Sequence, residues 1–433
     1  MLPKGPTISA ARQTLQWHFR PTEVLSDAAA RYGTPFTLRI LGRAPAVILS
    51  DPEHVRSVFK SAPDVFLTGA ANQGFRTHIG PHSLLTLDGA DHQRHRRMLS
   101  PPFHEARMRA YTEGIWTGTV ARIERWSVGG EVRLLTAMHE LTFDLILDSV
   151  FGISNPALLR ELRRLAAILS RESSSVVMFL PFLRKDLGRF NGWGRFLRAR
   201  REGDRILYGE IDRALDTSDE RSDILGMLAR QGSKVANPLS RAEIHDELMT
   251  LLAVGHATTA VALTWAFQST LSSADVTRRV REEVREGLGG GFQPESLEQL
   301  SFVDAVICES LRLHPPVLLI VRQLAQDASI ADFDLPRGTL VRPCPYLTHR
   351  DPRFFPDPEV FRPERFLNGR PGPYEYYPFG GGPRSCIGGA YALHQMRIIF
   401  AAVMSHLDLS LLKESSDRTS RFSLLVAPEH GTS

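Results

Sequence analysis

A Gly-rich stretch that carries a cysteine just before a helix constrains this 433-residue chain most strongly. It reads FGGGPRSCIG from Phe379 to Gly388. Residues 391–407 contain no Pro or Gly and carry apolar residues at helical spacing, so a helix is expected to begin near Ile387. Free amides and the helix dipole at that terminus favour a thiolate at Cys386. Such a thiolate is a soft axial ligand suited to haem iron.

The neighbours of Cys386 suit a large flat ligand. The glycines before and after it remove side-chain bulk, so the backbone could approach such a ligand closely. Phe379 offers an aromatic face, and Arg384 offers a planar cation for a carboxylate. A small buried cysteine in a Gly-rich turn is the alternative, and it is the ordinary explanation of a free cysteine taken alone.

The pattern Phe-x-x-Gly-x-Arg-x-Cys-x-Gly is complete at Phe379, Gly382, Arg384, Cys386 and Gly388. It resembles the haem-binding loop of the cytochrome P450 monooxygenases. Further segments match that family in its order, so that the resemblance covers nearly the whole chain. The resemblance implies haem b (iron protoporphyrin IX) as cofactor, with Cys386 as the metal ligand and Phe379, Arg384 and Gly388 around the ring.

Composition agrees with one large core, because 42% of the residues are apolar and no linker, repeat or low-complexity tract divides the chain. With the resemblance, this predicts the cytochrome P450 fold, mainly α with a small β-rich portion. We expect a single haem-thiolate monooxygenase domain over residues 1–433, with residues 1–20 as an irregular N-terminal segment.

Charge and cysteine content indicate the cellular compartment of the protein and the kind of partner it binds. Three widely spaced cysteines argue against a disulfide framework and for a reducing compartment. The first twenty residues have no apolar stretch for secretion or anchoring, which predicts a cytoplasmic protein without a membrane anchor. A net charge of +4 suggests a basic face for an acidic partner and no nucleic-acid binding.

Residues 91–99 are predicted to form a basic helix. His92 and Arg96 are four residues apart and share a face, whereas Arg94 and Arg97 point elsewhere. A solvated helix face is the alternative. In the P450 family, the positions that His92 and Arg96 match bind a haem propionate, and Arg94 and Arg97 would then face a redox partner.

A long segment without charged residues, 248–274, follows a capping box at Ser240–Glu243. It is long enough to span a bilayer, but His256, Gln268 and acidic flanking residues favour a buried helix.

Within this segment, AVGHATT from Ala253 to Thr259 resembles the family's oxygen-activation motif, Ala-Gly-x-(Asp/Glu)-Thr. Gly255 and Thr258 match, and the resemblance implies a catalytic role for Thr258. Ala257 stands where the family usually has an acid. A threonine that bonds its own helix is the alternative. Our hypothesis is that water held by Thr258 and by helix carbonyls near Gly255 delivers protons instead.

Glu309 and Arg312 share a face of a helix over residues 300–313. They resemble the family's Glu-x-x-Arg pair, whose expected third partner here is Arg365. Buried carboxylates and guanidiniums persist only when they are paired, so a structural ion-pair network behind the cysteine loop is implied.

The segment after Pro315-Pro316 suits a buried strand over residues 317–321. In the family it edges the substrate pocket, and Arg322 matches a propionate ligand. The apolar run 176–183 matches the roof of that pocket. The predicted pocket residues are Val254, Leu318, Ile320 and Leu424.

Two strand pairs and one further helix complete the expected fold. Strands over 36–40 and 46–49 read as a hairpin, and a second strand pair is expected around Pro336-Arg337-Gly338. Asp51-Pro52 reads as the start of a helix that ends at Lys60.

These features together predict a haem-thiolate monooxygenase that inserts one oxygen atom of O2 into an apolar terpenoid, steroid, fatty acid or polyketide. Electrons would come from a separate ferredoxin- or flavodoxin-type donor with its reductase. An isomerase, dehydratase or peroxide-driven hydroxylase on the same scaffold is the alternative, because the acid at position 257 is missing. A non-catalytic haem or ligand sensor is a further one.

Overall fold

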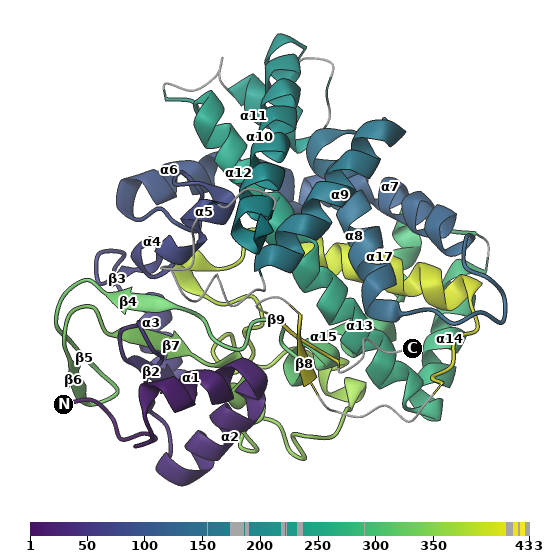
Figure 1. The fold of residues 1–433 in the computed structure, drawn as a ribbon. Coiled ribbons are helices and arrows are strands. Elements are labelled where there is room, and N and C mark those ends of the chain that lie inside the picture. The colour runs from purple at the N-terminus through teal and green to yellow at the C-terminus, as the bar shows by residue number, and fades with distance from the viewer. Residues whose placement is uncertain are drawn as a thin grey trace.

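The computed structural model describes residues 1–153, 155–173, 186, 190–217, 221, 223–231, 237–289, 291–412, 419–422 and 425–428. The strands gather with the first helices on one side of the molecule, and the longer helices occupy the other side (Figure 1). The helices up to residue 173 are α1 (Ala10–Phe19), α2 (Pro21–Tyr32), α3 (Pro52–Lys60), α4 (Thr68–Ala71), α5 (Arg76–Ile79), α6 (Gly89–Leu99), α7 (Glu105–Ile123), α8 (Leu134–Phe151) and α9 (Pro156–Ser173). The later helices are α10 (Gly192–Asp216), α11 (Ile224–Gln231), α12 (Arg241–Gly255), α13 (Ala257–Leu271), α14 (Ala274–Leu288), α15 (Ser301–Leu313), α16 (Pro345–Thr348) and α17 (Gly389–His406).

The main sheet of the described chain joins strands that are far apart in sequence. Its order is β1 (Phe36–Leu38), β2 (Ala46–Leu49), β7 (Leu340–Pro343), β4 (Arg322–Leu324) and β3 (Phe66–Leu67). The β2 and β7 strands run parallel, and the other neighbours are antiparallel. Two hairpins lie outside this sheet, β5 (Ala328–Ile330) with β6 (Phe333–Leu335), and β8 (Thr419–Phe422) with β9 (Leu425–Pro428).

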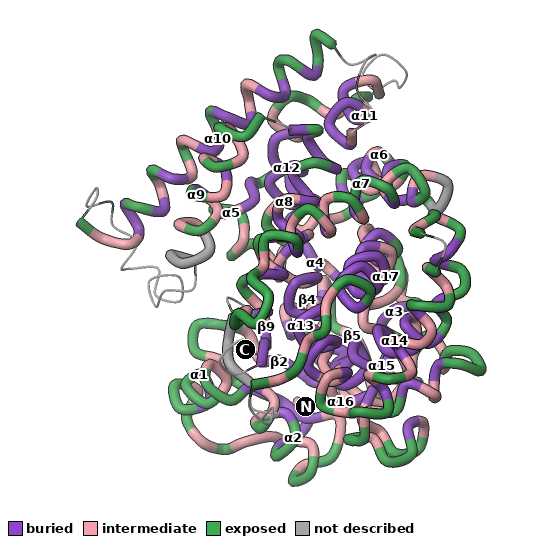
Figure 2. Tube along the Cα trace, turned by 90° about the vertical axis from the view of Figure 1, so that its right-hand side faces the viewer, coloured by how far each residue is buried: buried purple, intermediate pink, exposed green. Residues whose placement is uncertain are grey.

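The core of the helical side is built around α13. This helix packs against α8, α15 and α17, and large side chains such as Trp265 and Phe267 are buried on it. Figure 2 shows the same pattern, with α12, α13 and α17 largely buried and the outer face of α10 exposed. Burial on every side requires an apolar sequence all round, which is what this helix has.

The stretch Arg241–Leu271, which combines α12 and α13, is long and apolar enough to cross a membrane by length and composition. However, 67% of its most apolar window is buried inside the protein. This agrees with the interpretation of a core helix. The capping box predicted at its start is present, because the Ser240 hydroxyl and the Glu243 carboxylate each accept from the other's backbone amide.

Three sequence-based expectations for the fold are wrong in part. Residues 10–19 are helical, so the N-terminal segment is not irregular throughout. The second strand pair turns at Ala331 and Asp332, which both have positive φ (52° and 64°), and not at Pro336–Gly338. The strand expected over 317–321 begins only at Arg322. The predicted pocket roof at 176–183 lies outside the described residues.

Candidate functional site

Cys386 lies between a tight turn and the first residue of α17. Its amide donates to the Phe379 carbonyl at 2.9 Å, and the Gly380 amide donates to the Tyr377 carbonyl at 2.9 Å. Gly388 caps α17, so the helix begins close to the predicted position. Of the free cysteines in the described chain, Cys386 is exposed, whereas Cys308 and Cys344 are buried.

Burial raises the pKa of the Cys386 thiol, although the Gly388 amide and the Arg96 guanidinium both act to lower that pKa. The net direction is opposite to the thiolate that the helix terminus predicts, because desolvation outweighs the nearby dipole and charge. The residue is nevertheless exposed, so a ligand can reach it. A metal ion bound to the sulfur would supply the positive charge that the thiolate needs.

Two glycines of the loop serve a different purpose from the one predicted. A Cβ at Gly381 would lie 2.2 Å from Cδ2 of Phe59, and a Cβ at Gly382 would lie 2.3 Å from the Phe59 carbonyl oxygen. Gly382 also has a φ of 67°. These glycines therefore let the loop pack against the end of α3. At Gly388 a Cβ would meet nothing within 4 Å, so open space borders the loop there.

Four predicted cofactor residues converge from three parts of the chain. His92 and Arg96 come from α6, Arg322 from β4 and Arg384 from the cysteine loop. A small cavity of about 50 Å³ is lined by His92, Arg322 and Arg384 together with Phe59. Arg96 donates to the Ser385 carbonyl at 2.8 Å, which ties α6 directly to the residue before the cysteine.

The charges of this cluster do not balance within the described chain. Burial lowers the pKa of His92 to about 3, with further lowering by Arg384, Arg96, His95 and Arg322. Burial also lowers the pKa of Arg322 to about 10 and that of Arg384 to about 10. His92 is therefore neutral, while the guanidiniums stay charged.

The carboxylate that pairs with this cluster already has other hydrogen-bond partners. Asp88 accepts from Arg384 at 2.6 Å, and also from the amides of Thr68, Gly69 and Ala70 at the start of α4. Within the described residues, Arg322 donates to the carbonyls of Val321 and Gly381 and to no carboxylate. An excess of positive charge beside a thiol fits a dianionic ligand with a metal centre, as haem b is. Asp88 was not found by sequence reasoning, because an isolated aspartate before a helix reads as an ordinary cap.

The predicted oxygen-activation segment lies at a break in a long helix. The α12 helix ends at Gly255 and α13 begins at Ala257. A Cβ at Gly255 would lie 3.2 Å from Cδ1 of Ile146 on α8, so the glycine allows close packing there. On the other side, Ala253 and Val254 are exposed at the end of α12, and Val254 is 41% exposed. The break thus has one face against α8 and one accessible face.

Side chains donate hydrogen bonds to the backbone carbonyls around the break. The Nδ1 atom of His256 lies 2.6 Å from the Leu252 carbonyl, and its Nε2 atom lies 3.1 Å from Nε2 of His139 on α8. A carbonyl only accepts, so Nδ1 of His256 carries the proton and His139 donates to Nε2. Thr142 donates to the His256 carbonyl at 3.1 Å. His256 is therefore committed to α8 and does not replace the missing acid at position 257.

Thr258 bonds its own helix, as the alternative interpretation describes. Its Oγ1 donates to the Val254 carbonyl at 2.9 Å. Thr259 donates to the Gly255 carbonyl at 3.3 Å, and it is buried while Thr258 is partly exposed. The carbonyls that our hypothesis left free for water therefore have protein partners, and Thr258 is the hydroxyl of this pair that faces accessible space.

The other predicted pocket residues, apart from Val254 at the helix break, lie in different places. Ile320 lies against the cysteine loop, since a Cβ at Gly380 would be 3.5 Å from its Cδ1. Leu318 is buried in an apolar cluster with Leu25 of α2 and Val426 of β9. Leu424 lies outside the described residues.

The three residues predicted as an ion-pair network meet behind the cysteine loop. Arg312 donates to both carboxylate oxygens of Glu309 at 2.7 and 2.8 Å, and Arg365 donates to Glu309 at 3.3 Å. Arg312 also donates to the carbonyls of His349 and Pro358. His349 in turn accepts from the amide of Tyr377 at 2.9 Å, which connects the network to the turn before the cysteine.

Arg94 does not point to a partner protein as predicted. It forms an ion pair with Glu243 and donates to the Pro238 carbonyl at 3.2 Å, so it joins α6 to the start of α12. Helical spacing turned it away from His92, but another helix covers that side. Arg97 is exposed.

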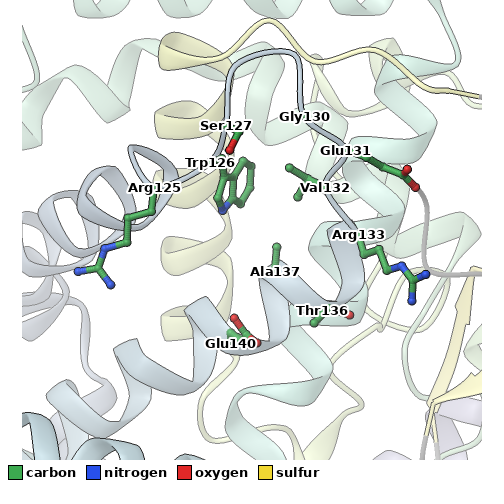
Figure 3. A pocket seen from close by; sticks show the side chains of 10 residues that line it. All are labelled: Arg125, Trp126, Ser127, Gly130, Glu131, Val132, Arg133, Thr136, Ala137 and Glu140. Carbon is green, nitrogen blue, oxygen red and sulfur yellow. The ribbon is translucent and has the colours of Figure 1, made fainter.

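A separate hollow of about 350 Å³ lies where α7 leads into α8 (Figure 3). Trp126, Val132 and Glu140 are among its lining residues. None of the predicted site residues lines it.

Comparison with known proteins agrees with this geometry. The cytochrome P450 family model matches residues 3–432. Cytochrome P450 135B1 of Mycobacterium tuberculosis is 32% identical over 432 residues, covering 99% of this chain and 90% of that protein. Cytochrome P450 138 of the same species is 33% identical over 410 residues, covering 94% and 90%.

The fold is also that of a solved relative. The retinoic acid-bound cyanobacterial CYP120A1 superposes with a TM-score of 0.86 at 26% sequence identity, covering 100% of this chain and 98% of that one. The chain therefore belongs to the cytochrome P450 family. Its activity is that of a cytochrome P450 monooxygenase, an oxidoreductase, and its cofactor is haem b.

Proposed function

We propose that Cys386 is the axial ligand of the haem iron and that His92, Arg96, Arg322 and Arg384 hold the haem propionates. One observation carries this proposal. The exposed cysteine shares a loop with Arg384. Arg384 belongs to a cluster of three guanidiniums, and the one carboxylate that pairs with this cluster, Asp88, already accepts other hydrogen bonds. Two propionates would balance that charge. Phe379 and Gly388 would border the flat ring.

When bound, haem supplies the activation of O2 and the transfer of one oxygen atom to the substrate. The protein's own residues hold the group, exclude water and supply protons. Thr258 holds a proton on Oγ1 at the accessible face of the helix break. Gly255 lets this turn pack against α8, and the small side chain of Ala257 leaves room beside the hydroxyl for water.

The substrate is proposed to be an apolar small molecule, such as a terpenoid, steroid, fatty acid or polyketide. Val254 offers an exposed apolar side chain at the break, and Ile320 offers another beside the cysteine loop. Leu318 extends this apolar lining towards the sheet. The retinoic acid named for CYP120A1 is a molecule with a mostly apolar body that ends in a carboxylate.

Electrons are proposed to come from a separate ferredoxin- or flavodoxin-type donor with its reductase. Exposed Arg97 on α6 is near the propionate cluster in sequence and is open to an acidic partner. We also propose a cytoplasmic location and a single functional domain over the chain.

Turnover with an added ferredoxin, its reductase and NADH tests the proposed reaction. A monooxygenase consumes NADH and O2 and yields a product with one added oxygen atom, which ¹⁸O2 labels. An isomerase or dehydratase, which the alanine at position 257 leaves open, would give product without NADH consumption. A peroxide-driven hydroxylase would need only peroxide. Product that forms without NADH or label would reject the monooxygenase assignment.

A further inference from the structure

Arg342 lies in a row of apolar side chains across the main sheet. On β7 it pairs with Ile48 of β2, which in turn pairs with Phe36 of β1. Residues directly opposite each other in a sheet present their side chains on the same face. Ile48, Phe36 and the neighbouring Leu340 belong to the apolar cluster that also contains Leu318. Arg342 therefore shares its face of the sheet with a predicted pocket residue.

The opposite face of the sheet is distinct. Val47 and Val341 belong to the cluster that packs against Phe59 of α3, where the Arg322 guanidinium lies 5.9 Å from the ring centroid. Arg322 thus faces the proposed propionate site, while Arg342 does not. Arg322 and Arg342 therefore lie on opposite faces of the sheet.

Arg342 has no protein partner within the part of the chain that the structure describes. Its Nε atom is buried without an acceptor, and the side chain is only partly exposed. Burial lowers the pKa of Arg342 to about 10, and the only charge that adds to this effect is another cation, Arg43. By contrast, buried Arg312 donates to Glu309 and to backbone carbonyls.

A guanidinium with a buried and unpaired Nε atom is unusual because it cannot lose its proton to avoid the cost of desolvation. Its planar pattern of donors matches a carboxylate, which can accept two parallel hydrogen bonds. Arg43 is exposed in the turn before β2, and its Nη2 atom would be 3.6 Å from a Cβ at Gly74. A second cation therefore lies near enough to Arg342 for its charge to act on it.

The chain also connects Arg342 with the cysteine loop. The Ile320 amide donates to the carbonyl of Pro343, the residue after Arg342, at 2.8 Å. Ile320 borders Gly380 of the cysteine loop, and Leu318 lies in the apolar cluster on the face of Arg342. These contacts connect Arg342 to the cysteine loop through two apolar side chains.

We propose that Arg342 binds the carboxylate of an amphipathic substrate, a long-chain monocarboxylic acid whose apolar body extends past Leu318 and Ile320 towards the cysteine loop. This inference rests on the proposed function, because it names the substrate class of that same site. Arg342 then determines specificity by distinguishing an acid from a neutral molecule of the same length.

Equilibrium dialysis of the haem-loaded protein with dodecanoic acid and with 1-dodecanol tests the proposal. The wild type should bind the acid at least about 10-fold more tightly than the alcohol, because a hydrogen bond to a charged group is worth about that much. Arg342→Leu should weaken binding of the acid by about 10- to 100-fold and leave that of the alcohol unchanged or tighter. Arg342→Lys should retain part of the preference. The exposed Arg337→Leu is the matched control and should behave as wild type.

The wild type alone provides a second test, should Arg342→Leu fail to fold. Its preference for the acid should decrease below about pH 4, where the carboxylate becomes protonated. Equal binding of acid and alcohol by the wild type at pH 7 would overturn the inference, as would a parallel loss of both ligands in Arg342→Leu. The red-shifted Soret band of the reduced CO complex keeps the two proposals apart. If this band is present and the preference for the acid is absent, only the proposed substrate class is rejected. If the wild type lacks the band, the proposed function itself is rejected.

Discussion

Ala257 is a residue at which this chain departs from its family's pattern, because the family usually has an acid there, beside the threonine that Thr258 matches. The nearest titratable side chain in sequence, His256, is bonded to Leu252 and His139 on the α8 side. Burial lowers its pKa to about 3, so it stays neutral. A hydroxyl with no carboxylate beside it must pass protons through water.

Thr258→Ala should divert reducing equivalents to peroxide while haem content and fold persist, because the hydroxyl at the accessible face of the break is lost. Thr258→Ser should retain most of the coupling. Product formed per NADH consumed is the measurement, with Thr259→Ser as control, since Thr259 is buried beside it. Wild-type coupling in Thr258→Ala would show that protons reach the site by another route.

Glu243 links acid stability to the contact between α6 and α12. Burial acts to raise its pKa, but the Ser240 amide and hydroxyl, His95 and Arg94 outweigh burial and lower the pKa to about 2. A depressed carboxyl pKa stabilises the fold above its ordinary value of 4.5 and loses this effect as the pH falls towards 2.

Glu243→Gln should therefore reduce the loss of unfolding free energy between pH 5 and 3 by about 1 kcal/mol, after allowance for solvent screening. Urea unfolding of both proteins at these two pH values is the measurement. Glu282→Gln, which changes a carboxylate whose side chain is 43% exposed, should leave the pH dependence as it is in the wild type. If Glu243→Gln has the same slope as the wild type, the carboxylate does not contribute.

At the scale of elements, α15 supports the cysteine loop through a chain of buried polar contacts. Arg312 on this helix bonds the carbonyl of His349, and His349 accepts from the amide of Tyr377 just before the loop. The side chains of Glu309 and Arg312 are both 0% exposed. Such a pair fixes the position of the loop only while every partner is present.

Glu309→Leu should destabilise the protein by about 3–5 kcal/mol, because it leaves the buried Arg312 without a counter-charge. The haem content of the purified protein should fall with it. Denaturant unfolding and the haem-to-protein ratio are the measurements. Asp275→Ala breaks an exposed pair with Arg278 and should cost about 0–1 kcal/mol. A Glu309→Leu variant as stable as that control would disprove the structural role.

Local signals predicted the elements that depend on neighbours in sequence. The cap at Asp51, the hairpin of β1 and β2 and the capping box at Ser240 are all present. The turn at Ala331–Asp332 could not be predicted, because alanine gives no sign of positive φ. The parallel pairing of β2 with β7 and the contact of Gly381 with Phe59 depend on distant residues.

The candidate site shows the same division. The positions of Cys386, His92 and Arg96 followed from a family pattern in the sequence. Asp88, His139 and the partner of Arg94 did not, because each acts through a helix far away in the chain. Arg342 carried no signal either, since one arginine in a strand looks like any other until its lack of a partner within the described chain is known.

At the scale of the whole molecule, the two outward-turned arginines of α6 have different environments. Arg94 is paired with Glu243, whereas Arg97 is exposed. Only an exposed cation can attract an acidic donor protein at a distance and raise its association rate. The surface around α6 is therefore the proposed docking face for the electron donor.

Arg97→Glu should slow reduction by an acidic ferredoxin at low salt, and the difference should shrink above about 0.1 M salt, where charges are screened beyond about 10 Å. Stopped-flow reduction kinetics provide the measurement. Arg12→Glu, an exposed change on α1, should have little effect. Equal rates for Arg97→Glu and wild type at low salt, with intact haem, would exclude this docking face.

The spectrum of the dithionite-reduced CO complex tests the central claim, thiolate ligation by Cys386, most directly. The wild type should show the red-shifted Soret band that a thiolate ligand produces, and Cys386→His should lose that band while haem remains bound. Cys308→Ser and Cys344→Ser should keep the band, because both residues are buried, whereas Cys386 is exposed. A wild-type spectrum like that of a histidine-ligated haem, or a red-shifted band that survives in Cys386→His, would contradict the account.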